Sequence, residues 1–322
     1  MKDFPLITIG VLCYNTGEFV VESLDCIKRQ NYPNVEIIII DDCSTDGISV
    51  DLVQKYIENN HLQCSFIRQK ENKGISYNLN EIIEKTNSIS KYLVLLGDDL
   101  WDDDFLRKSA EILEQSDENE ILLYSDVRMM DYDTKEIIDE TNSMTIHPNS
   151  ENSQRLFSEH KGDLYKLKNK DLMEFLFETN PIYPIGMMLK TQPFKKAGGY
   201  CNKYFFEDYP TWFKLAKQGF DFLYYHKTLT TYVRHGKNIS NIRNNEIRQV
   251  NRALTIENIA YCNRLYTLKK IVPQLIYNHG GEGWFSLAKI KFALHLMLQN
   301  KKIFPAIVSN IIDKVFKIER TY

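Results

Sequence analysis

The chain has 322 residues with 43% hydrophobic and 26% charged side chains, enough to bury the core of one large α/β domain with a helical appendage. A formal net charge of −3 provides no basic field to attract phosphates, so no nucleic-acid partner is expected. The absence of a CxxC pair, of an 18-residue apolar run and of a signal-peptide pattern predicts a cytoplasmic protein without a membrane span.

Strands and helices are predicted to alternate over the first 115 residues. Apolar, β-branched runs predict strands at 6–12, 36–40, 65–68 and 92–96. Apolar residues recur at helical spacing from Val20 to Ile27, Val50 to Ile57, Ile75 to Ile83 and Leu106 to Leu113. This alternation predicts the α/β class, with an open, mostly parallel sheet that carries helices on both faces.

The second half of the chain is less regular. Strands are predicted in ILLYSDVRMMDYD and GMMLK, and FFEDYPTWFKLAKQGF predicts a turn followed by a helix. Residues 141–170 are polar and mixed in charge, which predicts a variable insertion. Residues 250–322 predict helices. We therefore expect one globular domain over 1–240 and a C-terminal helical segment over 241–322.

Polar clusters follow the predicted strands. They are Tyr14-Asn15, Asp41-Asp42, Asn72-Lys73-Gly74 and Asp98-Asp99. In open α/β sheets, ligands bind outside the carboxyl ends of the strands. The clusters therefore predict one pocket.

The segment EIIIIDDCSTD places Asp41 and Asp42 at a strand end, where a carboxylate can accept a hydrogen bond from a base N–H or a ribose hydroxyl. Ser44 and Asp46 are predicted to cap the next helix. In ENKGISYNLN, Gly74 allows close backbone approach at a helix N-terminus whose N–H groups suit an anion. Lys73 could add a charge there, and an ordinary loop-to-helix join fits equally well.

The segment LLGDDLWDDDFL contains five aspartates. Asp98 and Asp99 directly follow the strand, where carboxylates can hold a hard divalent cation. Asp102, Asp103 and Asp104 precede an apolar helical face, which predicts the polar start of a helix.

Two later segments carry further candidates. In FFEDYPTWFKLA, Glu207 and Asp208 lie at a predicted helix N-terminus, where Asp208 is either an N-cap or a general base kept ionised by the helix dipole. In TYVRHGKNIS, His235 lies in a polar loop, as an ordinary surface residue or as part of a metal site.

Taken in this order, the motifs resemble the family-2 glycosyltransferases, whose GT-A fold binds nucleotide sugars. The resemblance covers about residues 1–240 and implies a nucleotide-sugar-binding half at 1–120 and an acceptor-binding, catalytic-base half at 121–240. It rests on ITIGVLCYNTGEFVVESLDCIKRQNYPNVEIIIIDDCSTD, NKGISYNLN, LLGDDLW, FFEDYPTWFKLA and YVRHGKNIS.

The resemblance implies roles for these residues. The nucleotide-binding set would be Cys13, Tyr14, Asn15, Asp41, Asp42, Asn72, Lys73, Gly74 and Asp98, with Asp42 favoured over Asp41 for the base or ribose. Asp208 would be the catalytic base, and Asp98 with His235 would hold Mn²⁺ or Mg²⁺. Asp99 and Glu207 would support them.

The sequence departs from the family pattern at Leu96, which replaces the first aspartate of the DxD motif and makes the metal requirement less secure. The implied function is inverting transfer of a sugar from a nucleoside-diphosphate sugar, which we expect to be UDP-linked, to an acceptor hydroxyl. The acceptor would be a glycan, glycolipid or lipid-linked molecule in bacterial surface polysaccharide or cell-wall synthesis. The alternative is a catalytically degenerate sugar-nucleotide-binding or scaffold protein.

The C-terminal segment leaves two alternatives open. Residues 281–322 carry seven Lys or Arg against three Asp or Glu. Its apolar and basic helices could contact the inner face of the cell membrane peripherally, or form a lid or a homodimer surface.

Overall fold

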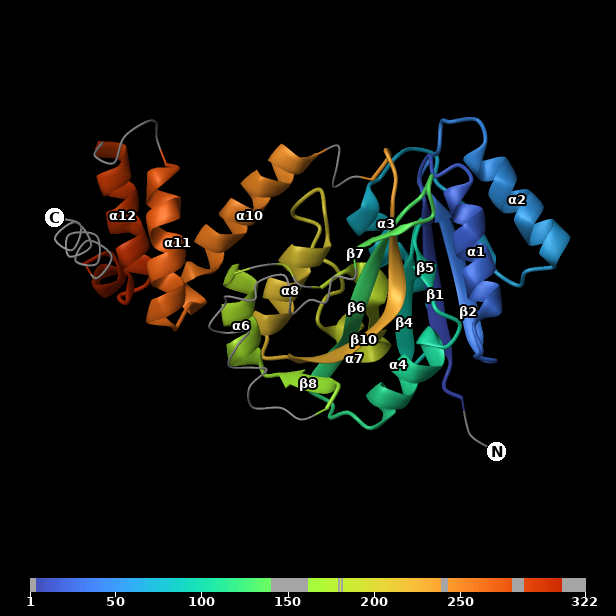
Figure 1. Ribbon diagram of the computed structural model, residues 1–322, viewed down its shortest axis with the longest axis horizontal. Coiled ribbons are helices and arrows are strands. Elements are labelled where there is room, and N and C mark those ends of the chain that lie inside the picture. The colour runs from blue at the N-terminus through green and yellow to red at the C-terminus, as the bar shows by residue number, and fades with distance from the viewer. Residues whose placement is uncertain are drawn as a thin grey trace. The chain divides into compact units, whose positions relative to one another are not determined.

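The computed structural model describes residues 4–139, 162–178, 180, 182–238, 243–279 and 287–308. Its strands are β1 (Ile7–Cys13), β2 (Val35–Asp41), β3 (Ser65–Arg68), β4 (Tyr92–Leu96), β5 (Leu100–Trp101), β6 (Glu120–Asp131), β7 (Ile137–Asp139), β8 (Leu164–Leu167), β9 (Met187–Lys190) and β10 (Asp221–Arg234). They form one mixed sheet in the order β3-β2-β1-β4-β9-β6-β10-β5, with β7 on β6 and β8 on β10 (Figure 1). The strands from β3 to β4 pair in parallel, as do β6 and β10, while β9 runs antiparallel between β4 and β6. The predicted mostly parallel α/β sheet is confirmed.

Helices cover both faces of this sheet. They are α1 (Phe19–Arg29), α2 (Ser49–Asn60), α3 (Ile75–Lys85), α4 (Phe105–Glu114), α7 (Thr191–Lys196) and α8 (Asp208–Lys217), with the 3-10 turn η1 (Pro184–Gly186). Because side chains alternate along a strand, Ile9 and Val11 of β1 join one core with Leu24 of α1. Gly10, between them, faces Ile82 of α3 on the other side.

The segment predicted as a variable insertion is partly regular. Residues 140–161 lie outside the described residues, but 164–167 form β8, which pairs with the first part of β10. Helix α6 (Asn169–Glu178) follows directly. Pairing with a distant strand compensates for the weak local pattern of LYKL, and whether the segment is a variable insertion stays a prediction.

The three aspartates before α4 do not cap it with their side chains. Asp104 occupies the N-cap position without a side-chain capping hydrogen bond. The carboxylates form ion pairs instead: Asp102 with Arg128, Asp103 with Arg29, and Asp104 with Lys108. The predicted helix start is confirmed, and these aspartates also tie it to other elements.

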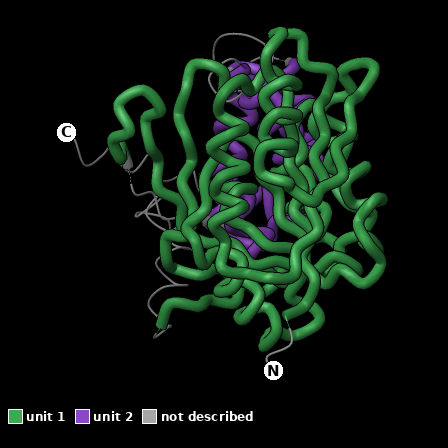
Figure 2. The backbone as a smooth tube through the Cα atoms, turned by 90° about the vertical axis from the view of Figure 1, so that its right-hand side faces the viewer, with its two compact units in different colours: residues 1–169, 181–242 green, residues 170–180, 243–322 purple. Residues whose placement is uncertain are grey.

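The chain divides into two compact units (Figure 2). One contains residues 1–169 and 181–242, and the other contains 170–180 and 243–322. The second unit contains α10 (Asn244–Asn258), η2 (Ile259–Tyr261), α11 (Leu265–Tyr277) and α12 (Leu287–Gln299). Glu174 of α6 belongs with them, because its carboxylate accepts the N–H groups of Asn263 and Arg264 at 2.5 and 3.1 Å. The functional halves at 1–120 and 121–240 stay a prediction.

Two further features concern the cysteines and the helices. All six cysteines are free thiols. Within the described ranges, every helix is too short or too polar to cross a membrane.

Gly10 provides a test of this packing. An added Cβ would lie 2.9 Å from both Ile82 and Leu95 side-chain carbons. Gly10→Ala should therefore lower the free energy of unfolding by about 1–3 kcal/mol, measured by urea denaturation. Gly236→Ala is the control, since its Cβ would enter open space. Equal stability of the two variants would contradict the packing of α3 on β1.

Candidate active site

The loops after β1, β2 and β4 leave the sheet at neighbouring points, because these parallel strands end close together. Cys13 at the end of β1 pairs with Asp41 at the end of β2, and Val11 pairs with Leu96 at the end of β4. This register collects the polar clusters at one edge, as the sequence predicts.

Asp41 supports the loop between β2 and α2. Its buried carboxylate accepts hydrogen bonds from the Ser44 hydroxyl (2.5 Å) and N–H (3.1 Å). The Ser44 hydroxyl accepts the Asn15 N–H at 2.9 Å, and Asn15 Oδ1 accepts the Asp46 N–H at 3.1 Å. The predicted capping role of Ser44 is therefore wrong, because its hydroxyl joins two loops. Asp46 does cap α2, accepting the Ser49 N–H at 3.0 Å.

Asp42 holds the loop before α3 against the end of β2. Its carboxylate accepts the backbone N–H groups of Lys73 and Gly74 at 2.8 and 2.9 Å. Asn72 Nδ2 donates to the Asp42 carbonyl at 3.3 Å. Gly74 has φ of +83° and is the N-cap of α3, a conformation that favours glycine. The anion at these two N–H groups is thus the protein's own carboxylate.

The three predicted residues after β1 differ in exposure. The Cys13 thiol lies in the core at 1% exposure, and burial followed by the Asp41 charge raises its pKa. The Cys13 carbonyl accepts the Asp42 N–H at 2.8 Å. The thiol and the carbonyl of Cys13 are thus both engaged within the protein, and its nucleotide contact stays a prediction. Tyr14 is 49% exposed, and Asn15 adopts φ of +53°.

Asp98 and His235 meet although 137 residues separate them. His235 Nε2 lies 2.8 Å from Asp98 Oδ2. The imidazole is almost fully buried and stacks on Phe19 of α1 with ring centroids 3.9 Å apart. The structure therefore brings together the carboxylate and imidazole that the sequence proposes as metal ligands.

His235 is held in position by three residues that the sequence did not point to: Phe19, Lys237 and Asn238. Phe19 stacks on the imidazole, and Asn238 Oδ1 accepts the backbone N–H of His235 at 2.7 Å. The Lys237 N–H donates to His235 Nδ1 at 3.2 Å, and Lys237 Nζ donates to the Asn15 carbonyl at 3.3 Å. The segment HGKN already contained the two polar partners, but only the fold places them around the ring.

Asp99 has a different environment from its neighbour Asp98. Its carboxylate accepts the Val233 N–H at 2.9 Å, and its carbonyl accepts the Ser23 hydroxyl at 2.9 Å. Burial, then the Asp98 charge, raises the pKa of Asp99 well above its ordinary value. Asp99 therefore joins the β4–β5 turn to β10.

A cavity of about 210 Å³ opens at this edge of the sheet. Its polar lining includes Asp98, Asp99 and Glu207, which come from the end of β4 and the start of α8. Its walls are Leu12, Ile75, Leu79, Leu95, Leu96, Gly97, Tyr183, Pro184, Ile185 and Tyr232. Leu96, at 3% exposure, presents an apolar surface where the resemblance implies a carboxylate.

Glu207 and Asp208 form an asymmetric acidic pair. Burial, then the Asp208 charge, raises the pKa of Glu207 to about 8. The same Asp208 charge contributes to raising the pKa values of Tyr200 and Tyr209. Asp208 is the first residue of α8, and the N-cap position belongs to Glu207. At neutral pH, Glu207 therefore carries a proton, next to Asp208 in the first turn of α8.

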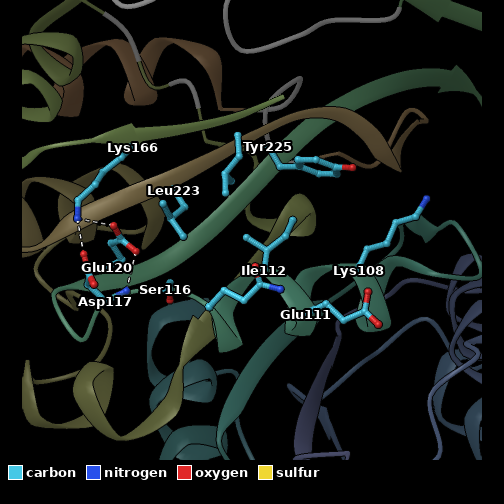
Figure 3. Close-up of a pocket in the computed structure, with 11 residues that line it drawn as sticks. Lys108, Glu111, Ile112, Ser116, Asp117, Glu120, Lys166, Leu223 and Tyr225 are labelled. Atoms are coloured by element: carbon cyan, nitrogen blue, oxygen red, sulfur yellow. Dashed lines mark hydrogen bonds and ion pairs between the residues drawn. The ribbon is translucent and has the colours of Figure 1, made fainter. Parts of the chain in front are cut away.

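A larger groove of about 570 Å³ lies near the amino ends of β6 and β10 (Figure 3). Its lining includes Lys166, whose ammonium pairs with Glu120 at 2.5 Å and Asp117 at 2.9 Å. The residues that line this groove come from outside the sequence motifs, whereas Asp98, Asp99 and Glu207 line the smaller cavity. The smaller cavity is therefore the better candidate active site.

Comparison with known proteins identifies relatives. Residues 8–176 match the family described as Glycosyl transferase family 2. An uncharacterized glycosyltransferase of Haemophilus influenzae is 28% identical over 267 residues, which cover 81% of this chain and 75% of the relative. The putative teichuronic acid biosynthesis glycosyltransferase TuaG of Bacillus subtilis is 31% identical over 110 residues, covering 34% of this chain and 42% of TuaG.

Solved structures share the fold. TarS of S. aureus, residues 1–349 in complex with UDP-GlcNAc, matches with a TM-score of 0.59 and 16% identity over 95% of this chain and 80% of that one. In a longer TarS structure the match covers 45% of that chain. The mannosyltransferase PcManGT of Pyrobaculum calidifontis, in complex with GDP-Man and Mn²⁺, matches with a TM-score of 0.52 and 16% identity, covering 97% and 76% of the two chains.

The raised pKa of Glu207 predicts a pH dependence of stability. Its contribution is fully present below the unfolded pKa near 4.5 and is lost as pH rises through about 8. Between these values the free energy of unfolding should fall by up to about 1.4 kcal/mol per pH unit. Glu207→Gln should flatten this slope in denaturation series from pH 5 to 8. Glu58→Gln, on the exposed side of α2, is the control and should keep the wild-type slope.

Proposed function

The chain belongs to glycosyl transferase family 2, and on this premise we propose that it transfers a sugar from a nucleoside-diphosphate sugar to an acceptor hydroxyl with inversion. The TarS complex with UDP-GlcNAc supports a UDP-linked donor. The name of TuaG, which refers to teichuronic acid biosynthesis, supports an acceptor in bacterial surface polysaccharide synthesis. A glycan, glycolipid or lipid-linked molecule would supply the hydroxyl.

One observation carries the proposal: a single cavity is lined both by Asp98, the partner of His235, and by Glu207, the N-cap residue of α8 that precedes Asp208. The Asp98–His235 contact suits a donor diphosphate and its metal ion. The acidic residues at the N-terminus of α8 suit removal of a proton from an acceptor. Sugar transfer needs both, on opposite sides of the anomeric carbon.

Asp208 is proposed as the general base. The acceptor proton moves to its carboxylate, the acceptor oxygen bonds to the anomeric carbon, and the bond from that carbon to the diphosphate oxygen breaks. Glu207 favours this role because its protonated, neutral form adds no second negative charge beside Asp208. General-base catalysis of this kind typically supplies about 10²–10⁴-fold in rate.

A divalent cation fits the observed residues as a site with two protein ligands. Asp98 Oδ2 and His235 Nε2 are 2.8 Å apart, and carboxylate with imidazole suits Mn²⁺. Asp99 would not be a ligand, since its carboxylate is buried and accepts the Val233 N–H. Among the described residues, no cluster of three or more His, Cys, Asp or Glu could hold a metal. When bound, Mn²⁺ or Mg²⁺ would neutralise charge on the departing diphosphate.

The nucleotide is proposed to lie between the loop after β1 and the loop at 71–74. Exposed Tyr14 offers an aromatic surface there, and Asn72 and Lys73 border the same edge. Asp42 is proposed to act for the base or ribose through the loop that its carboxylate orders. Asp41 is proposed to contribute by holding Ser44.

The apolar side chain of Leu96 favours a second candidate, a sugar-nucleotide-binding protein without transfer activity. Metal-dependent hydrolysis of UDP-GlcNAc separates the two candidates. An active transferase should release UDP slowly in the presence of Mn²⁺, whereas a scaffold protein releases none.

Replacement of the proposed base tests the catalytic assignment. Asp208→Asn should lower the rate of UDP release by about 10²–10⁴-fold while the UDP dissociation constant stays within a few-fold. Asp51→Asn, an exposed aspartate of α2, is the control. Near-normal turnover in Asp208→Asn would show that another group accepts the proton.

Removal of the imidazole tests the cation site. His235→Gln should weaken the Mn²⁺-dependent part of the thermal shift produced by UDP, because one of two protein ligands is lost. The shift produced by UDP in EDTA should change little. His61→Gln, an exposed histidine after α2, is the control. An unchanged Mn²⁺ effect in His235→Gln would remove this residue from the site.

A further inference from the structure

Helix α12 and the short helical stretch at 303–308 present a strip of exposed apolar side chains. Ile290, Leu294 and Leu298 are 50%, 54% and 86% exposed, and their spacing of four residues places them on one side of the helix. Phe304 and Val308 continue the exposed apolar surface at 60% and 37%. We call these five residues the apolar strip.

The opposite side of α12 is held within the C-terminal unit. Leu296 and Asn300 are buried there. Asn300 Nδ2 donates to the carbonyls of Ile259 and Cys262 at 2.9 and 2.7 Å. These contacts fix the rotation of the helix, so the strip cannot turn inward without breaking them.

Lysines accompany the strip, and acidic residues are absent. Residues 287–308 contain no Asp or Glu, and of their four lysines Lys291, Lys301 and Lys302 are exposed while Lys289 is buried. At 100° per residue, Lys291 borders the strip about 20° beyond Leu298. Lys301 and Lys302 are exposed between the two parts of the strip. The surface therefore combines an apolar strip with three exposed lysines and no Asp or Glu from residues 287–308.

We propose that this surface binds the face of an anionic lipid bilayer. An apolar face bordered by lysines is what an interfacial helix needs to enter the acyl boundary and contact lipid phosphates. At 13 residues, α12 is about 20 Å long and would lie along the bilayer surface. The proposal does not depend on which sugar is transferred.

Charge complementarity favours lipid over a second copy of the chain. A two-fold interface would place this surface against itself, with lysines facing lysines and no carboxylate from 287–308 to pair with them. An anionic bilayer supplies the missing negative charge.

Flotation of the full chain tests the proposal. Vesicles of phosphatidylcholine with phosphatidylglycerol should carry the protein upward, and vesicles of phosphatidylcholine alone should not. Lys291→Gln/Lys301→Gln/Lys302→Gln should weaken partitioning about fivefold per lysine, or about 100-fold in all. Lys55→Gln/Lys168→Gln/Lys196→Gln changes the net charge equally on exposed positions of the other unit and should partition as wild type.

The apolar contribution needs its own pair of variants. Leu294→Ser/Leu298→Ser should weaken partitioning at least about tenfold. Ile89→Ser, at a side chain 75% exposed in the other unit, should have no effect. UDP-GlcNAc hydrolysis without vesicles should be unchanged in all variants, which separates failure of this proposal from failure of the proposed activity.

Three results would overturn the proposal. They are equal flotation with neutral and anionic vesicles, no loss in the lysine variant, or a wild-type dimer in analytical ultracentrifugation that the leucine variant dissociates without a change in flotation. The last result would assign the strip to a second copy. If the leucine variant does not fold, flotation of the lysine variant with anionic vesicles still tests the proposal.

Discussion

Buried carboxylates at the ends of β2 and β4 hold the loops of the candidate site, because a carboxylate removed from water needs hydrogen-bond donors. Asp41 takes them from Ser44, Asp42 from the backbone of Lys73 and Gly74, and Asp99 from Val233. For Asp42 and Asp99 the donor belongs to another loop or strand. Ser44 lies in the loop that directly follows Asp41, and its hydroxyl links that loop to Asn15. The hydrogen bonds that these buried carboxyl groups need therefore also order this edge of the sheet.

This requirement also separates the residues that shape the site from those available for chemistry. Asp41, Asp42 and Asp99 have their oxygens engaged by backbone or hydroxyl donors within the protein. Asp98 instead faces an imidazole, a partner that can share a cation with it. Leu96 lowers the number of carboxylates around this point, so any cation there depends more heavily on His235 and on the donor's own phosphates.

The acidic pair on α8 follows similar physics. Two adjacent carboxylates do not both ionise easily in a buried place, and the more buried Glu207 keeps its proton. Asp208 is less buried and lies in the first turn of the helix. Burial and the neighbouring charge together thereby give two adjacent acidic residues different properties.

The sequence by itself determined the order of strands and helices, because alternating apolar patterns record which faces are buried. It also determined that polar clusters follow the strands, and the start of α4 after Asp104. Tertiary structure alone decided which carboxylates are satisfied internally, since Val233 and Asp99 are 134 residues apart and His235 and Asp98 are 137 apart. It likewise decided that Ser44 joins loops, that Cys13 faces the core, and that residues 164–167 form a strand. These outcomes depend on contacts between residues that are far apart in the sequence, and the local pattern of apolar and polar residues does not specify such contacts.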